Sequence, residues 1–196
     1  MTKLILFTLF FSLNVNSRTF YPGDILLVPM KCYLCQLIEG STNSIYSHLY
    51  IYLGKGNFAH SLGKVEKVTL DQIRNIVDSS RPSLHLRHYQ WSDGWEEKLN
   101  SSFNKEFISL PYDKDFLWDN FDNSGKEKLY CSEFIVKIYE KALGIKLKIF
   151  PMDYTFGRDF WQDYFNGNIP DNLPGVSPGH FEKNSKFIKI RKYNLF

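Results

Sequence analysis

The chain has 196 residues, of which 43% are hydrophobic and 17% aromatic, and its formal net charge is +3. This composition predicts a densely packed folded domain that is large enough for a real core. Because the charge is small and scattered along the chain, we expect no nucleic-acid partner.

The first seventeen residues have the features of a secretory signal. Lys3 supplies a short positive region, residues 4–13 form an apolar stretch, and Val15-Asn16-Ser17 offers small or medium side chains for cleavage. A membrane anchor is the weaker interpretation, because ten apolar-biased residues fall short of the roughly 20 that span a bilayer. We therefore expect a signal peptide over residues 1–17 and one exported domain over 18–196, periplasmic or secreted, without a stable membrane span.

The first structural elements are a short strand and a helix that carries two cysteines. Ile25–Val28 follows a turn and predicts the strand, and residues 31–39 predict the helix. In an oxidising compartment Cys32 and Cys35 can form a short-loop disulfide. Alternatively, they are two small core residues on one helix face, since cysteines on adjacent turns of a regular helix rarely meet disulfide geometry. The sequence favours the second alternative without deciding between them.

A hairpin with two histidines comes next. His48 opens an alternating strand that runs to Leu53, the turn is Gly54-Lys55-Gly56, and His60 lies in the following strand over residues 57–61. With a three-residue loop, His48 pairs with either His60 or Leu62. Both registers put the two histidines on one sheet face, about 5 to 8 Å apart. A two-residue loop would shift the register by one and place them on opposite faces.

The middle of the chain predicts structural elements rather than sites. Thr69 and Gln72 form a capping box for a short helix, and residues 84–89 predict a strand. Ser92-Asp93 is expected to cap a helix that reaches Phe107. His85 and His88, in the predicted strand over residues 84–89, face opposite sides, and no nearby carboxylate or cysteine completes a ligand set. We therefore expect exposed or strand-edge histidines and no metal site.

Two charged segments also favour structural interpretations. Asp113, Asp115, Asp119 and Asp122 lack calcium-loop spacing and predict a polar loop that borders a cleft. Near the C-terminus, lysines and Arg191 alternate with Phe187, Ile188 and Ile190, which predicts a terminal strand with a solvated basic face.

The third cysteine, Cys131, has no partner left if Cys32 and Cys35 pair, and an unpaired cysteine in an exported protein is a candidate reactive thiol. It lies at the start of a helix that begins near Tyr130 and stops at Gly144. At the first turn of a helix, unpaired backbone N–H groups favour a thiolate and can receive an oxyanion. An earlier start near Ser124 would place Cys131 in the second turn, and inert burial on the apolar face is an equal alternative.

These motifs, taken in order, resemble one known family. Gly23-Asp24-Ile25, Tyr46-Ser47-His48-Leu49, Pro111-Tyr112-Asp113 and Tyr130-Cys131-Ser132-Glu133-Phe134 are similar to motifs of the circularly permuted branch of the NlpC-type papain-like superfamily, the YiiX-like proteins. The resemblance covers approximately residues 22–145. As in that branch, the histidine precedes the cysteine along the chain.

The resemblance implies an α+β, papain-like fold, with a cysteine-bearing helix packed on a small antiparallel sheet that carries the histidines. It implies Cys131 as nucleophile, His48 as base and His60 at the third polar position, where the branch often has glutamate; Tyr112 matches a tyrosine that binds substrate or oxyanion. The implied activity is hydrolysis of an amide or ester through a thioester, without a metal or other cofactor. Export favours a peptidoglycan or other envelope peptide, and the alternatives are an acyl substrate or a non-catalytic binding module.

Overall fold

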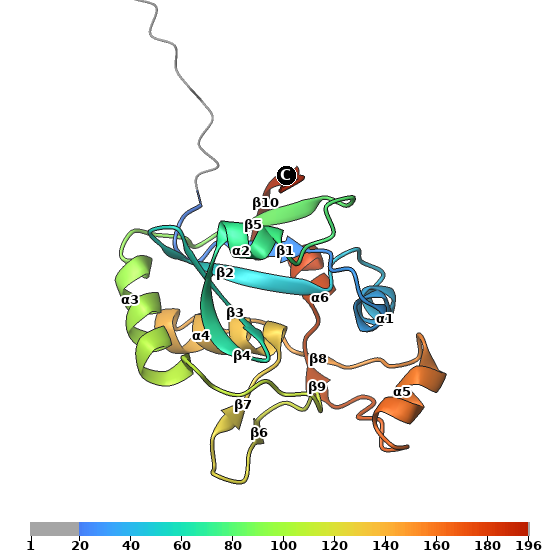
Figure 1. The fold of residues 1–196 in the computed structure, drawn as a ribbon. Helices are drawn as coiled ribbons and strands as arrows, with labels where there is room; N and C mark the ends of the chain where they lie inside the picture. Colours follow the sequence, from blue (N-terminus) through green and yellow to red (C-terminus); the bar gives the residue numbers. More distant parts are fainter. Residues whose placement is uncertain (1–19, 196) are drawn as a thin grey trace, which may run out of the picture.

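The structure is a computed structural model that describes residues 20–195. The predicted signal peptide lies outside these residues. At the centre is a six-stranded sheet in which every neighbouring pair is antiparallel (Figure 1). Its strands, in spatial order, are β10 (Phe187–Tyr193), β5 (Ser83–His88), β1 (Ile25–Val28), β2 (His48–Gly54), β3 (Asn57–Leu62) and β4 (Lys64–Thr69).

Helices and two small ladders surround this sheet. The helices are α1 (Tyr33–Thr42), α2 (Leu70–Arg74), α3 (Trp95–Ser102), a π-helical turn η1 (Phe103–Phe107), α4 (Cys131–Leu143), α5 (Arg158–Tyr164) and α6 (Pro178–Lys183). The ladders pair β6 (Asn120–Phe121) with β7 (Glu127–Lys128) and β8 (Phe150–Pro151) with β9 (Pro174–Gly175).

Both faces of the central strand β1 are covered, which explains why it is a continuous apolar run. On one face Ile25 and Leu27 belong to the main core, which α3 and α4 complete, and α4 packs directly on β2 and β3 (Figure 1). On the other face Leu26 and Val28 join a smaller core with Ile73 of α2. The predicted α+β fold, with the Cys131 helix on a small antiparallel sheet, is confirmed.

The turn between β2 and β3 differs from the predicted three-residue loop. Only Lys55 and Gly56 separate the strands, and both have positive φ, at 51° and 78°, as a tight hairpin turn requires. A two-residue loop was expected to place the two histidines on opposite faces of the sheet. Instead, a bulge between Tyr52 and Gly54 absorbs the one-residue difference. Beyond the bulge Ile51 is paired with Ala59. When this register is continued along the two strands, His48 lies opposite Leu62.

Two helices begin or end differently from their predicted limits. The first starts at Tyr33 rather than Lys31, because Cys32 is extended and serves as the N-cap. The helix expected from Ser92 to Phe107 instead begins at Trp95, after Gly94 at φ 87°, and becomes π-helical from Phe103. Since glycine alone takes such a φ without strain, Gly94 fixes the start of α3.

Strand β5 corrects the prediction for its histidines. They do face opposite sides, but His85 and His88 are both buried. His85 bonds Asp24, at 2.6 Å from its Nε2, and Arg87 donates two hydrogen bonds to the same carboxylate. Burial opposes the ionisation of Asp24, but these hydrogen bonds outweigh it and lower its pKa. The contacts of Asp24 with His85 and Arg87 therefore join the start of β1 to β5.

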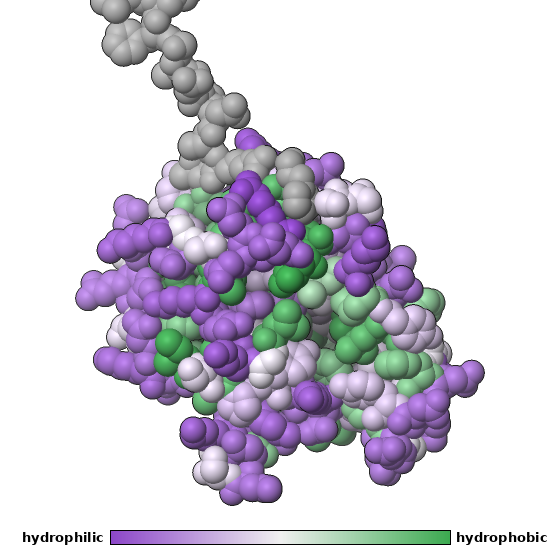
Figure 2. Space-filling view, in the orientation of Figure 1, coloured by the Kyte–Doolittle hydropathy of each residue, from purple (hydrophilic) through white to green (hydrophobic). Residues whose placement is uncertain are grey.

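The C-terminal strand exists as predicted, but its apolar residues do not alternate into the core. Phe187 is buried, whereas Ile188 and Ile190 are 53% and 42% exposed. A bulge between Lys189 and Arg191 interrupts the period-two pattern at this edge of the sheet. Elsewhere on the surface, hydrophobic residues gather over α1 and α5 (Figure 2), where Tyr33 is 61% exposed. Within residues 20–195, no helix has the length and apolarity that a bilayer crossing needs.

Candidate active site

Cys131 is the first residue of α4, so the helix begins at the predicted start near Tyr130 and not at the alternative start near Ser124. Its N-cap, Tyr130, is extended at φ −82° and ψ 167°. The earlier start does not occur, because Ser124 and Lys126 donate backbone N–H groups to the Asp122 carboxylate in the turn between β6 and β7. Among the described residues, Cys131 is the free cysteine.

The environment of this thiol contains opposing effects. Burial raises the pKa of Cys131 to about 12, although the Ser132 hydroxyl and the backbone N–H groups of Cys131 and Ser132 favour the thiolate. The sequence predicts a stabilised thiolate, but burial outweighs the helix terminus here. The resting site therefore holds a neutral thiol at the N-terminus of α4, next to the backbone N–H groups of Cys131 and Ser132.

His48 and His60 are joined directly. Nε2 of His48 lies 2.9 Å from Nδ1 of His60, and both rings are buried. Their predicted contact on one sheet face is confirmed. Burial lowers the pKa of His48 well below its usual value, with a further contribution from His60, and burial lowers the pKa of His60 to about 4. Both imidazoles are therefore neutral near pH 7, and a neutral imidazole is the form that acts as a base.

Glu66 is the carboxylate that lies nearest the second ring nitrogen of His60, which makes no hydrogen bond of its own among the described residues. It pairs with His60 across β3 and β4, and its Oε1 lies 3.8 Å from Nε2 of His60. A carboxylate favours a proton on the nitrogen that faces it, so Nδ1 of His60 is left as an acceptor. In this tautomer Nε2–H of His48 donates the 2.9 Å hydrogen bond to Nδ1 of His60. The Nδ1 lone pair of His48 is then free to accept a proton from a thiol.

Two tyrosines lie within electrostatic range of Cys131. Tyr112, predicted from its motif, has a pKa raised well above its usual value, by burial first and then by the Cys131 charge. Tyr50 was not predicted, although it lies two residues after His48 on the same strand face. Its ring centroid is 4.9 Å from that of His48 and 4.7 Å from that of His60. Burial, followed by the Cys131 charge, also raises the pKa of Tyr50.

The structure brings these residues near one another without completing the catalytic contact. Helix α4 packs on β2 and β3, and Ser61 Oγ of β3 donates a 2.5 Å hydrogen bond to the carbonyl of Leu129, just before the helix. Within residues 20–195, no hydrogen bond joins the Cys131 sulfur to His48. The required approach of the thiol to His48 Nδ1 therefore stays a prediction.

A mainly apolar pocket opens beside Cys131. Ser132 and Tyr130 of the helix start line it together with Ile38 and Ser41 of α1 and with the segment that follows α4. The other lining residues that carry the apolar character are Phe116, Met152, Tyr154, Trp161, Val176 and Pro178. The resemblance ended near residue 145, so it missed this C-terminal wall. Trp161 and Tyr154 pack 5.0 Å apart between ring centroids and make the wall rigid.

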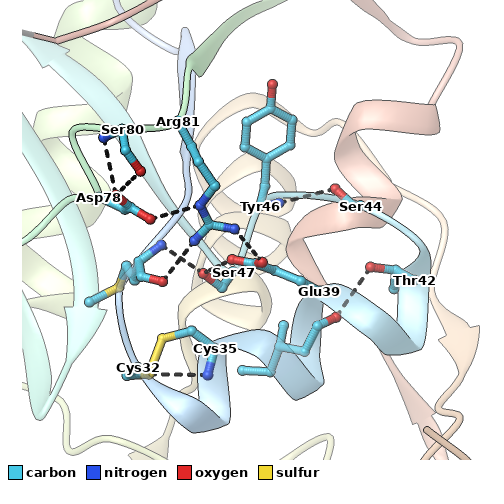
Figure 3. A network of polar contacts seen from close by, with 12 residues as sticks. Cys32, Cys35, Glu39, Thr42, Ser44, Tyr46, Ser47, Asp78, Ser80 and Arg81 are labelled. Carbon is cyan, nitrogen blue, oxygen red and sulfur yellow. Dashed lines mark hydrogen bonds and ion pairs between the residues drawn. A yellow bond between two sulfur atoms is a disulfide. The ribbon is translucent and has the colours of Figure 1, made fainter.

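A polar network fixes the start of β2, and hence His48 (Figure 3). Ser47 donates from its Oγ to Glu39 Oε1 at 2.9 Å and accepts from the Met30 backbone N–H at 2.9 Å. Arg81 donates to the second oxygen of Glu39 at 2.6 Å. The residue before His48 is therefore held by α1 and by the loop before β5.

One carboxylate cluster has donors of the kind a metal needs. Oxygens of Asp119, Glu127 and Glu133 lie within 4.8 Å of one another. The Lys137 ammonium, however, bonds all three, at 2.7 Å from Asp119 and 2.9 Å from Glu133. A lysine thus supplies the positive charge that a cation would bring.

In the predicted acidic loop, Asp113 is buried, and its carboxylate accepts hydrogen bonds from the backbone N–H groups of Asp115 and Leu117.

Comparisons with known proteins identify the family and support the fold. The family described as "Permuted papain-like amidase enzyme, YaeF/YiiX, C92 family" matches residues 19–187. An uncharacterized protein YiiX of Escherichia coli K12 is 25% identical over 186 residues, covering 90% of this chain and 88% of its own length. A crystal structure of YiiX from Escherichia coli O157:H7, titled a metalloprotein, superposes with a TM-score of 0.74 at 22% identity, over 87% of this chain and 96% of that one.

Proposed function

Because the chain belongs to the family of permuted papain-like amidase enzymes that includes YaeF and YiiX, we propose that it hydrolyses an amide through Cys131 and His48. One observation carries the proposal. A free thiol at the first turn of α4 borders a pocket, and α4 packs on the two strands that carry the joined histidines. In this proposal His60 holds and polarises His48, and Tyr112, which lies within electrostatic range of Cys131, takes the substrate-binding role.

The proposed reaction starts from neutral partners. As the sulfur attacks the carbonyl carbon, its proton passes to Nδ1 of His48, and the carbonyl oxygen becomes an oxyanion. Backbone N–H groups at the start of α4 stabilise that oxyanion. The C–N bond then breaks, the imidazolium gives its proton to the leaving amine, and a thioester remains. Water, deprotonated by the same imidazole, hydrolyses the thioester to an acid and restores the thiol.

We favour an envelope peptide as the substrate of an exported enzyme. The signal-like features of residues 1–17 support export, and so does the disulfide between Cys32 and Cys35, because disulfides persist mainly in oxidising compartments. An acyl substrate is the second candidate, and the apolar lining of the pocket favours it. A non-catalytic binding module is the third.

The test offers the purified protein peptidoglycan stem peptides and fatty-acyl esters, with products followed by mass spectrometry. We expect one class to be cleaved, an acyl adduct on Cys131 to be trapped, and Cys131→Ser to lower the rate at least about a thousandfold. Cys131→Ser is nearly isosteric, so its thermal unfolding should match that of the wild type. If no class is cleaved and an activated ester leaves Cys131 unmodified, the protein is a binding module.

A further inference from the structure

The Cys32–Cys35 pair lies outside the proposed chemistry and forms a disulfide. The preference for two core residues in one helix was wrong, because Cys32 is not in the helix. It is the N-cap of α1, with φ −149° and ψ 159°, and from there its sulfur reaches Cys35 one turn later (Figure 3). The two sulfurs are not equivalent, since Cys32 is exposed whereas Cys35 is buried at 5% exposure.

The surroundings of Cys32 favour a thiolate there. The backbone N–H of Cys35 donates to the Cys32 sulfur at 3.1 Å, so a hydrogen bond and the positive end of the ten-residue helix α1 act on this atom. Lys31, the exposed residue before it, adds a positive charge. Hydrogen bonds, a helix N-terminus and a neighbouring lysine are the features that lower a cysteine pKa and raise its thiolate fraction.

As a purely structural cross-link, this disulfide contributes little stability. Stabilisation by a cross-link grows with the loop that it closes, and this loop joins residues only three apart. Helix α1 is also held without it. Glu39 bonds Ser47 and Arg81, and Leu37 is buried at 4% exposure. These contacts lie two and four residues beyond Cys35, so α1 retains its attachment when the sulfur–sulfur bond opens.

We propose that Cys32–Cys35 is a thiol–disulfide exchange site that reacts with the thiols of another molecule while the protein stays folded. The thiolate of an incoming thiol attacks the exposed Cys32 sulfur, the bond between Cys32 and Cys35 breaks, and Cys35 leaves as a thiolate that takes a proton from water. A second thiolate of the incoming molecule then attacks that molecule's own sulfur in the mixed disulfide, the bond to Cys32 breaks, and Cys32 leaves as a thiolate that takes a proton from water. The two incoming thiols are thereby oxidised to one disulfide, and the Cys32–Cys35 pair is reduced. Exposed disulfides of this kind exchange more readily than buried structural ones.

The experiment uses the full chain with Cys131→Ser, so that the pair supplies every remaining thiol. The protein is equilibrated with reduced and oxidised dithiothreitol without denaturant, quenched with acid, and mass-tagged on free thiols. We expect complete reduction while circular dichroism stays at the folded value. A matched pair of variants then assigns the attacked sulfur. Cys131→Ser with Cys35→Ser keeps only Cys32, and Cys131→Ser with Cys32→Ser keeps only Cys35.

Cys32 alone should form a mixed disulfide with oxidised glutathione at least about tenfold faster than Cys35 alone at pH 7, and its rate should level off at a lower pH. Reduction that proceeds only in denaturant would overturn the proposal, as would equal rates for the two single thiols. Since neither measurement uses hydrolysis, the result is independent of the proposed amidase activity.

Discussion

At the scale of single residues, the chemistry of the candidate site depends on which histidine nitrogens carry protons. His60 supplies the acceptor that leaves His48 Nδ1 free, and it touches no reacting atom in the proposed mechanism. Its role is therefore orientation, and orientation affects turnover more than folding.

Replacing His60 tests that role. We expect His60→Ala to lower kcat by about a hundredfold, which is the lower range of what positioned acid–base groups contribute, while KM changes little. Urea unfolding of the same variant measures the cost of the lost side chain. Unchanged turnover would remove His60 from the site.

Glu66 gives a sharper test, because Glu66→Gln keeps the size of the side chain and removes its charge. We expect a fall in kcat of about threefold to tenfold, modest because Glu66 is partly exposed and screened by water. Nitrogen NMR shifts should show His60 losing its preference for a proton on Nε2.

The control for Glu66 is Lys64→Gln. Lys64 Nζ lies 3.7 Å from the other Glu66 oxygen, so this change removes the ion pair and leaves the carboxylate facing His60. If Lys64→Gln reproduced the loss of turnover, or if the His60 tautomer stayed unchanged in Glu66→Gln, the argument for Glu66 would fail.

At the scale of elements, α4 carries both Cys131 and the carboxylate that anchors its first turns. Glu133 is fully buried, and burial raises its pKa to about 7 against the opposing effect of Lys137. Its Oε1 accepts from the Asp119 backbone N–H at 3.1 Å and from Lys137. Lys137 therefore joins α4 to the β6–β7 segment.

Lys137→Met removes the cation and leaves Glu133 buried among like charges. We expect a loss of about 3 kcal/mol in the free energy of unfolding at pH 8. The loss should shrink toward pH 5. A carboxyl whose folded pKa is raised binds more protons folded than unfolded, so its folded state weakens as pH rises. Urea unfolding across this range measures it. Adding Glu133→Gln should restore most of the stability, and a double variant as unstable as the single one would contradict this account.

The elements that the sequence predicts well are those set by local patterns. Alternation defines β2, the Thr69–Gln72 capping box starts α2, and an apolar face ending at Gly144 defines α4. The features that the sequence did not predict depend on backbone angles or on partners distant in the chain. The disulfide needs the extended backbone of Cys32, and the Lys137 network joins residues up to 18 positions apart.

Glu66 was missed for a related reason. Of strand β4 only Val65 is buried, so alternation there is weak, and the register that sets Glu66 opposite His60 appears only in the folded sheet. The C-terminal wall of the pocket lay beyond the matched motifs. The residues of the candidate site were thus named from motifs, whereas their proton states were not predictable, because burial and cross-strand neighbours decide them.

At the scale of the whole molecule, buried neutral histidines make stability depend on pH. Burial lowers the pKa of His60, His88 and His180 to about 4, with smaller contributions from Lys186 for His88 and Lys183 for His180. The ordinary histidine pKa is about 6.5. Between these two values the unfolded chain binds more protons than the folded chain, so acid favours unfolding.

We therefore expect the contribution of these three histidines to the free energy of unfolding to be constant above about pH 7 and to fall from pH 6.5 toward pH 4, by up to about 1.4 kcal/mol per pH unit for each histidine. Glu133, whose folded pKa is raised, contributes a slope of the opposite sign over this range, and the histidines outnumber it. Urea unfolding at several pH values measures the slope. His88→Gln provides the control, because His88 packs against Trp95 and Phe187, away from Cys131, and its removal should flatten the slope by one histidine's share. If the slope between pH 6.5 and 4.5 were the same in His88→Gln as in the wild type, His88 would accept its proton without leaving its buried position, and this account would fail.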